Sequence, residues 1–181
     1  GATSGATVTV TATAAAFLAS DVDRQVIASA ARGVIVSVFS TTVATVNVRD
    51  PFPNTSQIAS GAWSIDGSPV TALTPDKKEP IGAQATLTLA AAGWRATDVG
   101  KFVVVHGGLI QITSVTSDTV AVGEILSVLS AVTAAPGGSW TLEAEAWTTT
   151  RGFPGAVTLF EQRLSFAGSP AQPDTLWASQ T

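Results

Sequence analysis

The stretch Gly5–Ala44, GATVTVTATAAAFLASDVDRQVIASAARGVIVSVFSTTVA, decides the fold, because it returns later in the chain as Gly82–Ala121, GAQATLTLAAAGWRATDVGKFVVVHGGLIQITSVTSDTVA. The two stretches align without a gap at a constant offset of 77 residues, and 17 of the 40 aligned positions are identical. The ungapped alignment extends over residues 5–66 and 82–143. Self-similarity at a fixed period is typical of a repeated structural unit, so we expect two copies of one small fold.

The residue pattern inside each copy favours β-structure. From Ala6 to Thr13, threonine alternates with small apolar residues, as expected for a strand that is buried on one face. Valine and threonine are frequent, and branching at Cβ favours the extended backbone. Similar runs follow, separated by turn-forming residues. We therefore predict an all-β fold in which each copy is a small β-barrel or β-sandwich.

The repeat also sets the expected domain boundaries. We predict a first β-repeat at residues 1–66, a Pro-rich linker at 67–81, a second β-repeat at 82–147 and the truncated start of a further β domain at 148–181. The linker is inferred from its prolines, which cannot donate to a β-ladder. The last segment contains only a few strand-like runs, so we expect it to belong to a larger sheet.

Composition and charge exclude several functional classes. The formal net charge is −4, only 12% of the residues are charged, and the chain has no cysteine. Lys and Arg are scattered, whereas tight nucleic-acid binding needs clustered cations. No apolar run approaches the roughly 18 residues that cross a bilayer as a helix, so we expect no membrane insertion. Because methionine is absent even at position 1, we expect a chain that was cut from a longer one or that begins at an engineered boundary.

Residues with catalytic chemistry are few, and we assign no catalytic, cofactor-binding or metal-binding residue. His106 is the one histidine, and it lies beside Gly107-Gly108 at an expected hairpin turn. A turn or surface histidine explains it better than a catalytic one, because no nucleophile pattern accompanies it. The Gly107-Gly108 and Gly137-Gly138 pairs lack the full fingerprint of a phosphate-binding loop.

Two acidic patterns allow a functional and a structural interpretation. Asp21 and Asp98 hold equivalent places in the two copies. They could be ligands of a hard cation such as calcium, but a cap of the following loop is favoured, because aspartate readily bonds to nearby backbone N–H groups. Glu143 and Glu145 alternate along a strand and could form a glycosidase pair, but a solvated strand face is the better interpretation.

The pair Lys77-Lys78 lies between Asp76 and Glu79 and is interpreted as part of the solvated linker.

The five tryptophans divide into two groups. Trp63 and Trp140 are equivalent across the copies, and Trp94 is equivalent to Phe17, so these aromatic residues are predicted to fill the core of each repeat. Trp147 and Trp177 fall outside the equivalence. Either could be an exposed ring for sugar stacking or subunit contact, and packing within the C-terminal sheet is the alternative that we favour.

The C-terminal segment resembles a passage of short-tailed bacteriophage tail tubular proteins of the B type, also called tail nozzle proteins. The resemblance rests on RGFP at 151–154, AVTLF at 156–160, QRLSFAG at 162–168 and PAQPDTLWAS at 170–179. The DVGK loop at 98–101 and GGLIQIT at 107–113 are similar to the β-rich modules that precede this passage in such proteins.

This resemblance implies a structural protein of the virion. Members of the family form a ring, commonly a hexamer, that meets the adaptor and other tail proteins such as tail fibres and conducts the genome into the host. The resemblance also implies that residues 151–181 are the opening strands of a β-propeller. DNA would pass through the ring without being tightly bound, which fits an acidic, cation-poor chain. No cofactor is implied.

A second functional class stays open on the residues alone. Tandem β-domains with tryptophans outside the repeat equivalence also suit a carbohydrate-binding or adhesion module without catalysis. Exposure of Trp147 or Trp177 in a shallow groove beside polar side chains would distinguish this module from the virion protein.

Overall fold

A computed structural model describes residues 4–28, 31–52, 55–145, 147, 153–169 and 172–179. The chain divides into two compact units, Gly1–Ala144 and Glu145–Thr181. The first unit holds both copies of the repeat, and the second holds the segment with the tail-protein resemblance. Arg151, Gly152, Pro170 and Ala171 of that resemblance lie outside the described residues.

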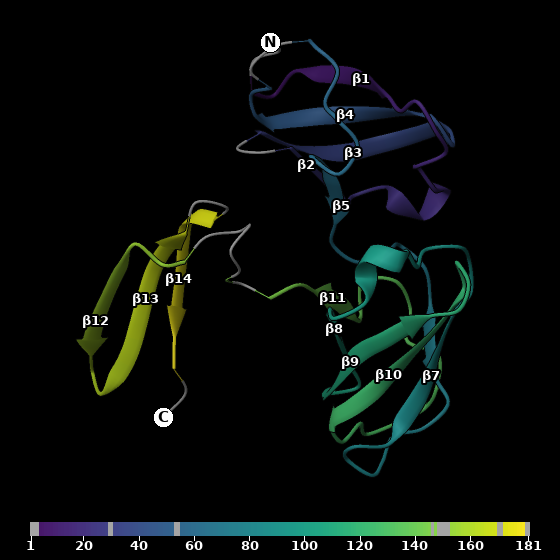
Figure 1. Ribbon diagram of the computed structural model, residues 1–181. Coiled ribbons are helices and arrows are strands. Elements are labelled where there is room, and N and C mark those ends of the chain that lie inside the picture. Colours follow the sequence, from purple (N-terminus) through teal and green to yellow (C-terminus); the bar gives the residue numbers. More distant parts are fainter. Residues whose placement is uncertain are drawn as a thin grey trace. The chain divides into compact units, whose positions relative to one another are not determined.

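The prediction of an all-β fold is confirmed. Every sheet is antiparallel, and one of them curls into a half-barrel (Figure 1). The helical turns among the described residues are two short 3₁₀ helices, η1 (Ala19–Asp21) and η2 (Ala96–Asp98). No helix in the described part of the chain is long and apolar enough to cross a membrane.

The first repeat is a five-stranded sheet with the order β1-β4-β3-β2-β5. Its strands are β1 (Thr7–Thr11), β2 (Gln25–Ala28), β3 (Ala31–Ser40), β4 (Val43–Asp50) and β5 (Ser64–Asp66).

The second repeat is a six-stranded sheet with the order β11-β8-β9-β10-β7-β6. Its strands are β6 (Leu73–Pro75), β7 (Gln84–Leu89), β8 (Phe102–Val105), β9 (Gly108–Val115), β10 (Val120–Ser127) and β11 (Thr141–Glu143).

The two sheets agree element by element at the offset found in the sequence. η2, β8, β10 and β11 each begin and end 77 residues after η1, β2, β4 and β5. The turn before β2 needs a left-handed backbone, which Asp23 adopts with φ 68° and its counterpart Gly100 with φ 87°. The internal repeat of the sequence is therefore a repeat of the fold.

Equivalent aromatic pairs pack in both cores, as predicted, with Phe17, Trp94 and Trp140 buried and Trp63 partly buried. The rings of Phe17 and Trp63 lie 6.1 Å apart in the first repeat, and those of Trp94 and Trp140 lie 5.8 Å apart in the second. Trp140 is 2% exposed, and its indole N–H donates to the Thr71 carbonyl. The aromatic pairs thus occupy the same place in each sheet and join its two ends through the core.

The segment at residues 67–81, which we expected to be a linker, contributes β6 to the second sheet. Leu73 is fully buried and Pro75 is also buried, so this short strand carries part of the core. Its prolines pointed to a linker in the sequence. A proline is tolerated here because β6 is the last strand of its sheet. A proline in such a strand can direct its nitrogen away from the neighbouring strand, so the missing N–H does not remove a hydrogen bond of the ladder.

The second unit is a three-stranded meander of β12 (Ala156–Phe160), β13 (Arg163–Ser169) and β14 (Gln172–Ala178). The register places Val157 beside Phe166 and Phe166 beside Trp177, so these side chains share one face of the sheet. Trp147 packs against that face. All five residues of β12 are exposed, so the sheet of this unit is largely uncovered.

In each repeat a glycine on one strand faces a branched side chain on the neighbouring strand, and the two residues stand on opposite strands in the two repeats. A Cβ atom on Gly33 would lie 2.2 Å from Cγ1 of Val46, and a Cβ atom on Gly123 would lie 2.5 Å from Cγ2 of Ile110. Position 33 is equivalent to position 110, and position 46 to position 123. Each core therefore accommodates one branched side chain at this contact. In the first repeat it is Val46 of β4, and in the second it is Ile110 of β9.

We expect this contact to show strong energetic coupling. Gly123→Val should lower the free energy of unfolding by about 1–3 kcal/mol through overpacking, and Ile110→Gly should lower it by about 3 kcal/mol or more through a cavity. The double variant copies the first repeat and should lose about 0.5–3 kcal/mol less than the sum of the two singles. Urea unfolding of the three variants measures this coupling, and strictly additive losses would contradict the exchange.

Candidate functional site: an ion-pair network between the repeats

The site is built from the two equivalent 3₁₀ turns of the first unit. In η1 the Asp21 carboxylate accepts a hydrogen bond from the Leu18 backbone N–H, with an N–O distance of 2.8 Å. In η2 the Asp98 carboxylate accepts the same bond from the Arg95 backbone N–H, also at 2.8 Å. Both aspartates are fully buried. The predicted caps are therefore present in both copies.

Each capping aspartate also binds a cation three residues further along. Arg24 Nη1 lies 3.0 Å from Asp21 Oδ1, and Lys101 Nζ lies 3.0 Å from Asp98 Oδ1. Arg24 and Lys101 are equivalent residues of the repeat. The repeated unit thus includes a buried aspartate that both caps a turn and neutralises a cation.

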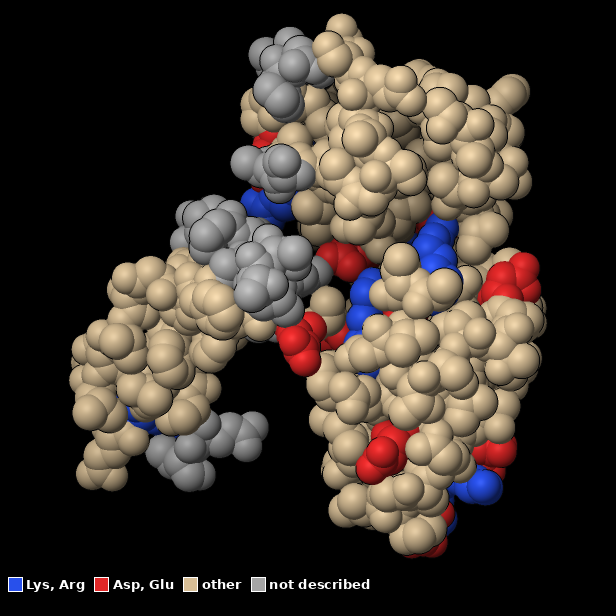
Figure 2. Space-filling view, in the orientation of Figure 1, with Lys and Arg blue, Asp and Glu red and all other residues tan. Residues whose placement is uncertain are grey.

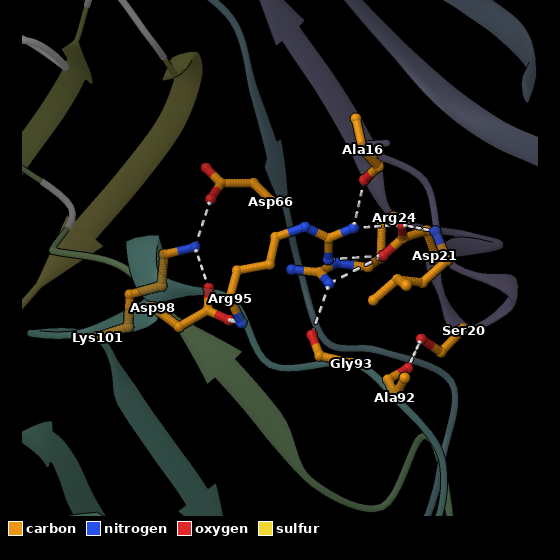
Figure 3. A network of polar contacts seen from close by, with 11 residues as sticks. Ala16, Ser20, Asp21, Arg24, Asp66, Ala92, Gly93, Arg95, Asp98 and Lys101 are labelled. Carbon is orange, nitrogen blue, oxygen red and sulfur yellow. Dashed lines mark hydrogen bonds and ion pairs between the residues drawn. The ribbon is translucent and has the colours of Figure 1, made fainter. Parts of the chain in front are cut away.

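Two of the cations form ion pairs between the copies (Figure 3). Arg95 reaches from the second repeat to the first, where Nη1 donates to Asp21 Oδ1 at 2.9 Å and Nη2 donates to Oδ2 of the same carboxylate. Its Nη2 also donates to the Ala16 carbonyl at 2.9 Å. Lys101 bridges the copies in the same direction, because its Nζ lies 3.1 Å from Asp66 Oδ1.

The Asp21 carboxylate is the centre of this network. It accepts from the Leu18 N–H, once from Arg24 and twice from Arg95, which uses the roughly four acceptor positions of an ionised carboxylate. The bidentate geometry with Arg95 is the strong form of a guanidinium–carboxylate pair. The Asp21 side chain therefore bonds to the backbone of its own turn, to Arg24 of its own repeat and to Arg95 of the neighbouring repeat.

Arg24 is an unusual residue of the core, because its side chain is fully buried. Burial, followed by the positive charge of Arg95, lowers the pKa of Arg24 from its ordinary value. Its Nη1 lies 3.4 Å from the Gly93 carbonyl of the second repeat, whereas its Nε and Nη2 have no hydrogen-bond partner. Removing Asp21 would leave this buried charge without the carboxylate that it contacts directly.

The charges of the network balance. Three carboxylates, Asp21, Asp66 and Asp98, face three cations, Arg24, Arg95 and Lys101. Figure 2 shows blue and red atoms gathered where the two repeats meet, while most of the remaining visible surface is uncharged. Because buried opposite charges need matched geometry, we infer that the network favours one arrangement of the two repeats. The ion pairs of this site connect the first repeat to the second.

The interpretation of Asp21 and Asp98 as calcium ligands finds no support in this geometry. Their oxygens are already used by backbone N–H groups and by cationic side chains. Within the described residues, no group of three or more His, Asp or Glu side chains could hold a metal ion.

His106 lies in the two-residue turn of the β8–β9 hairpin. Both turn residues have positive φ, 49° for His106 and 72° for Gly107, as a type I′ turn requires. The His106 ring Nε2 lies 2.8 Å from the Thr133 carbonyl, so the ring ties the hairpin to a neighbouring segment. The counterpart turn of the first repeat, at residues 29–30, lies outside the described residues.

The other predicted positions are two glutamates, a lysine pair and a glycine pair. Glu143 is exposed in β11 and belongs to the first unit, whereas Glu145 is exposed and belongs to the second unit. Lys77 and Lys78 are exposed, and the Lys77 Nζ donates to the Gln84 carbonyl at 3.2 Å. The Gly137-Gly138 pair lies in the loop before β11, where Gly138 has φ 84°.

Trp147 and Trp177 pack within the second unit. Their ring centroids lie 5.5 Å apart in an edge-to-face arrangement, and Trp147 contacts Phe166 at 4.8 Å in the same way. Both tryptophans are partly buried, and the indole nitrogen of Trp147 is buried without a hydrogen-bond partner. The two rings thus form the aromatic core of the small sheet.

Sequence reasoning found two aspartates of the network, Asp21 and Asp98, but missed Asp66 and the three cations. Arg95 has no counterpart in the first repeat, where Leu18 occupies the position, so the repeat gives no signal for it. A signal did exist for Arg24 and Lys101. Arg24 follows Asp21 by three residues, and Lys101 follows Asp98 by three residues. An acidic and a basic residue that recur at the same spacing in both copies indicate a structural ion pair.

No protein-family model matches the chain, and no curated protein and no solved structure matches it.

We predict that the two equivalent aspartates differ in importance. Asp21→Ala should lower the free energy of unfolding by about 3–5 kcal/mol, because it leaves Arg24 buried and unpaired. Asp98→Ala is the matched control and should lower it by only about 1–2 kcal/mol, because the cap is lost but Lys101 keeps Asp66. Urea denaturation of both variants measures the difference, and equal losses would show that Asp21 has no special role.

Proposed function

We propose that the chain is a non-enzymatic structural component of a bacteriophage tail nozzle, located in the virion. In this role it would self-associate into a hexameric ring, contact adaptor and tail-fibre proteins, and form part of the conduit for genome ejection. The observation that carries the proposal is the sequence of β12 and β13, which resembles the tail tubular protein B family and folds here into a sheet with an uncovered apolar face.

The exposed face of the second unit supports an assembling protein. Val157 is 63% exposed and Leu159 is 75% exposed, and they share a face with Phe166 and Trp177. An apolar face of this kind on a small sheet is a recognised mark of a protein–protein contact. The alternation of β12 places Thr158 on the opposite face.

The construction of the first unit supports a structural role. Two β-repeats are joined through a buried, charge-balanced network rather than by a flexible linker. A subunit of a conduit has to keep its domains in a fixed arrangement, which a bidentate buried pair favours through its geometric requirements.

The charge distribution supports a conduit that does not bind DNA tightly. Arg24, Arg32, Arg95 and Lys101 each form an ion pair with an aspartate of the same chain. Cations that are already neutralised release few counter-ions on meeting phosphate, so they contribute little to DNA affinity.

The carbohydrate-binding alternative has less support. Trp147 makes edge-to-face contacts with both Phe166 and Trp177, and both tryptophans are partly buried. Sugar stacking requires an open ring face beside polar side chains.

We expect negative-stain electron microscopy of the purified full-length protein at micromolar concentration to show rings with a central channel. The double variant Val157→Asp/Leu159→Asp should abolish the rings, because it places charges on the apolar face of β12. Thr158→Asp, on the opposite face of the same strand, is the matched control and should keep them. Separate small particles from the unsubstituted protein would contradict the proposal.

A further inference from the structure

The two repeats meet through the same segment of each copy. Residues 15–24 of the first repeat and their equivalents, residues 92–101 of the second, contain the 3₁₀ turns, the capping aspartates and two cations of the ion-pair network. Within these segments the Ser20 hydroxyl also donates to the Ala92 carbonyl. Contact through the same surface on both partners is the property of an isologous interface, in which a two-fold axis relates the partners.

Two equivalent backbone carbonyls show the reciprocity that a two-fold axis produces. The Ala16 carbonyl accepts a hydrogen bond from Nη2 of Arg95, with an N–O distance of 2.9 Å. The Gly93 carbonyl, which is equivalent to that of Ala16, accepts one from Nη1 of Arg24 at 3.4 Å. Each carbonyl therefore binds an arginine of the opposite repeat.

A small pocket between the repeats has the same reciprocity. Its volume is about 220 Å³. Six of its lining residues form three equivalent pairs, which are Phe17 with Trp94, Leu18 with Arg95, and Thr41 with Asp118. Equivalent residues of two partners come close to each other only near the axis that relates them. The pocket therefore lies close to a local two-fold axis between the repeats.

The ion-pair network has two similar halves around this axis. Figure 3 shows Asp98 and Lys101 on one side of the Arg95 side chain, and their equivalents Asp21 and Arg24 on the other side. In each half the aspartate accepts a hydrogen bond from a backbone N–H three residues before it and from a cation three residues after it. The halves differ at the bridging arginine, because the residue equivalent to Arg95 is a leucine and brings no charge to Asp98.

The second half could accept the same bridge. Within the described residues Asp98 accepts two hydrogen bonds, whereas an ionised carboxylate offers about four acceptor positions. Leu18 has φ −119° and ψ 152°, and Arg95 has φ −131° and ψ 152°, so the two side chains leave the backbone in the same way. Both side chains are partly buried. An arginine at position 18 would therefore not have to bury its charge fully.

We propose that residues 15–24 and 92–101 are two copies of one self-complementary interaction surface, whose partner is a second copy of the same unit related by a local two-fold axis. In this chain the second copy is the neighbouring repeat. It follows that a bridging arginine can act from position 18 as well as from position 95, because the two positions face Asp98 and Asp21 in equivalent ways. This inference is independent of the proposed virion function.

Relocating the arginine tests the proposal in the full chain. Arg95→Leu removes the bidentate pair with Asp21 and should lower the melting temperature by about 3–10 °C. Adding Leu18→Arg places the arginine at the equivalent position of the other repeat, where we expect it to recover at least half of that loss by binding Asp98. Scanning calorimetry measures the transition that Arg95→Leu shifts.

Two controls isolate the relocated ion pair. Leu18→Gln in the Arg95→Leu background supplies a polar side chain without a charge, and it should recover nothing. Asp98→Ala should cancel the gain from Leu18→Arg, because it removes the expected partner. This gain is the difference between two chains that both lack the Asp98 carboxylate, so the loss of the cap does not enter it.

Three results would overturn the proposal. Leu18→Arg could recover nothing in the Arg95→Leu background, which would show that position 18 is not equivalent to position 95 at the interface. Failure of the Leu18→Arg chain to fold where the Leu18→Gln chain folds would have the same meaning. A recovery that persists after Asp98→Ala would show that the relocated arginine binds elsewhere.

Discussion

The buried carboxylate of Asp21 is the interaction on which the first unit depends. A carboxylate removed from water must be compensated by several donors, and Asp21 finds them in a backbone N–H of its own turn, in Arg24 of its own repeat and in Arg95 of the next repeat. The fold of one repeat, the burial of Arg24 and the joint between the repeats therefore share one acceptor. Asp98 caps its turn and binds Lys101 in the same way, but Lys101 also binds Asp66 and so does not depend on Asp98 alone.

The two repeats show how one fold is adapted at equivalent positions. The glycine at 33 and the glycine at 123 lie on opposite strands of the same contact, so core volume is kept while the residues exchange places. The joint between the repeats differs from this pattern, because Arg95 has Leu18 as its counterpart. The 3₁₀ turns and the aromatic pairs are thus common to both repeats, whereas this residue of the joint is not.

Most of the fold was predictable from the sequence, and the interface was not. The offset of 77 residues and the period-two alternation predicted the strands of both sheets, because backbone pattern is a local property. β6 was missed because its prolines resemble a linker, and only its pairing with β7 shows it to be an edge strand. Arg95 was missed because its partner Asp21 lies 74 residues away and its counterpart is Leu18, so neither local pattern nor repetition marks it.

The distance between the repeats in solution tests the central claim most directly. Ser37 on β3 and Ser114 on β9 are equivalent and exposed, and the absence of cysteine allows a spin label at each through cysteine substitution. Double electron–electron resonance should give one narrow distance distribution in this doubly labelled chain. Adding Asp21→Ala should broaden it, and adding Asp98→Ala should leave it narrow. A broad distribution before either aspartate is changed, or no response to Asp21→Ala, would contradict a joint held by the Asp21 carboxylate.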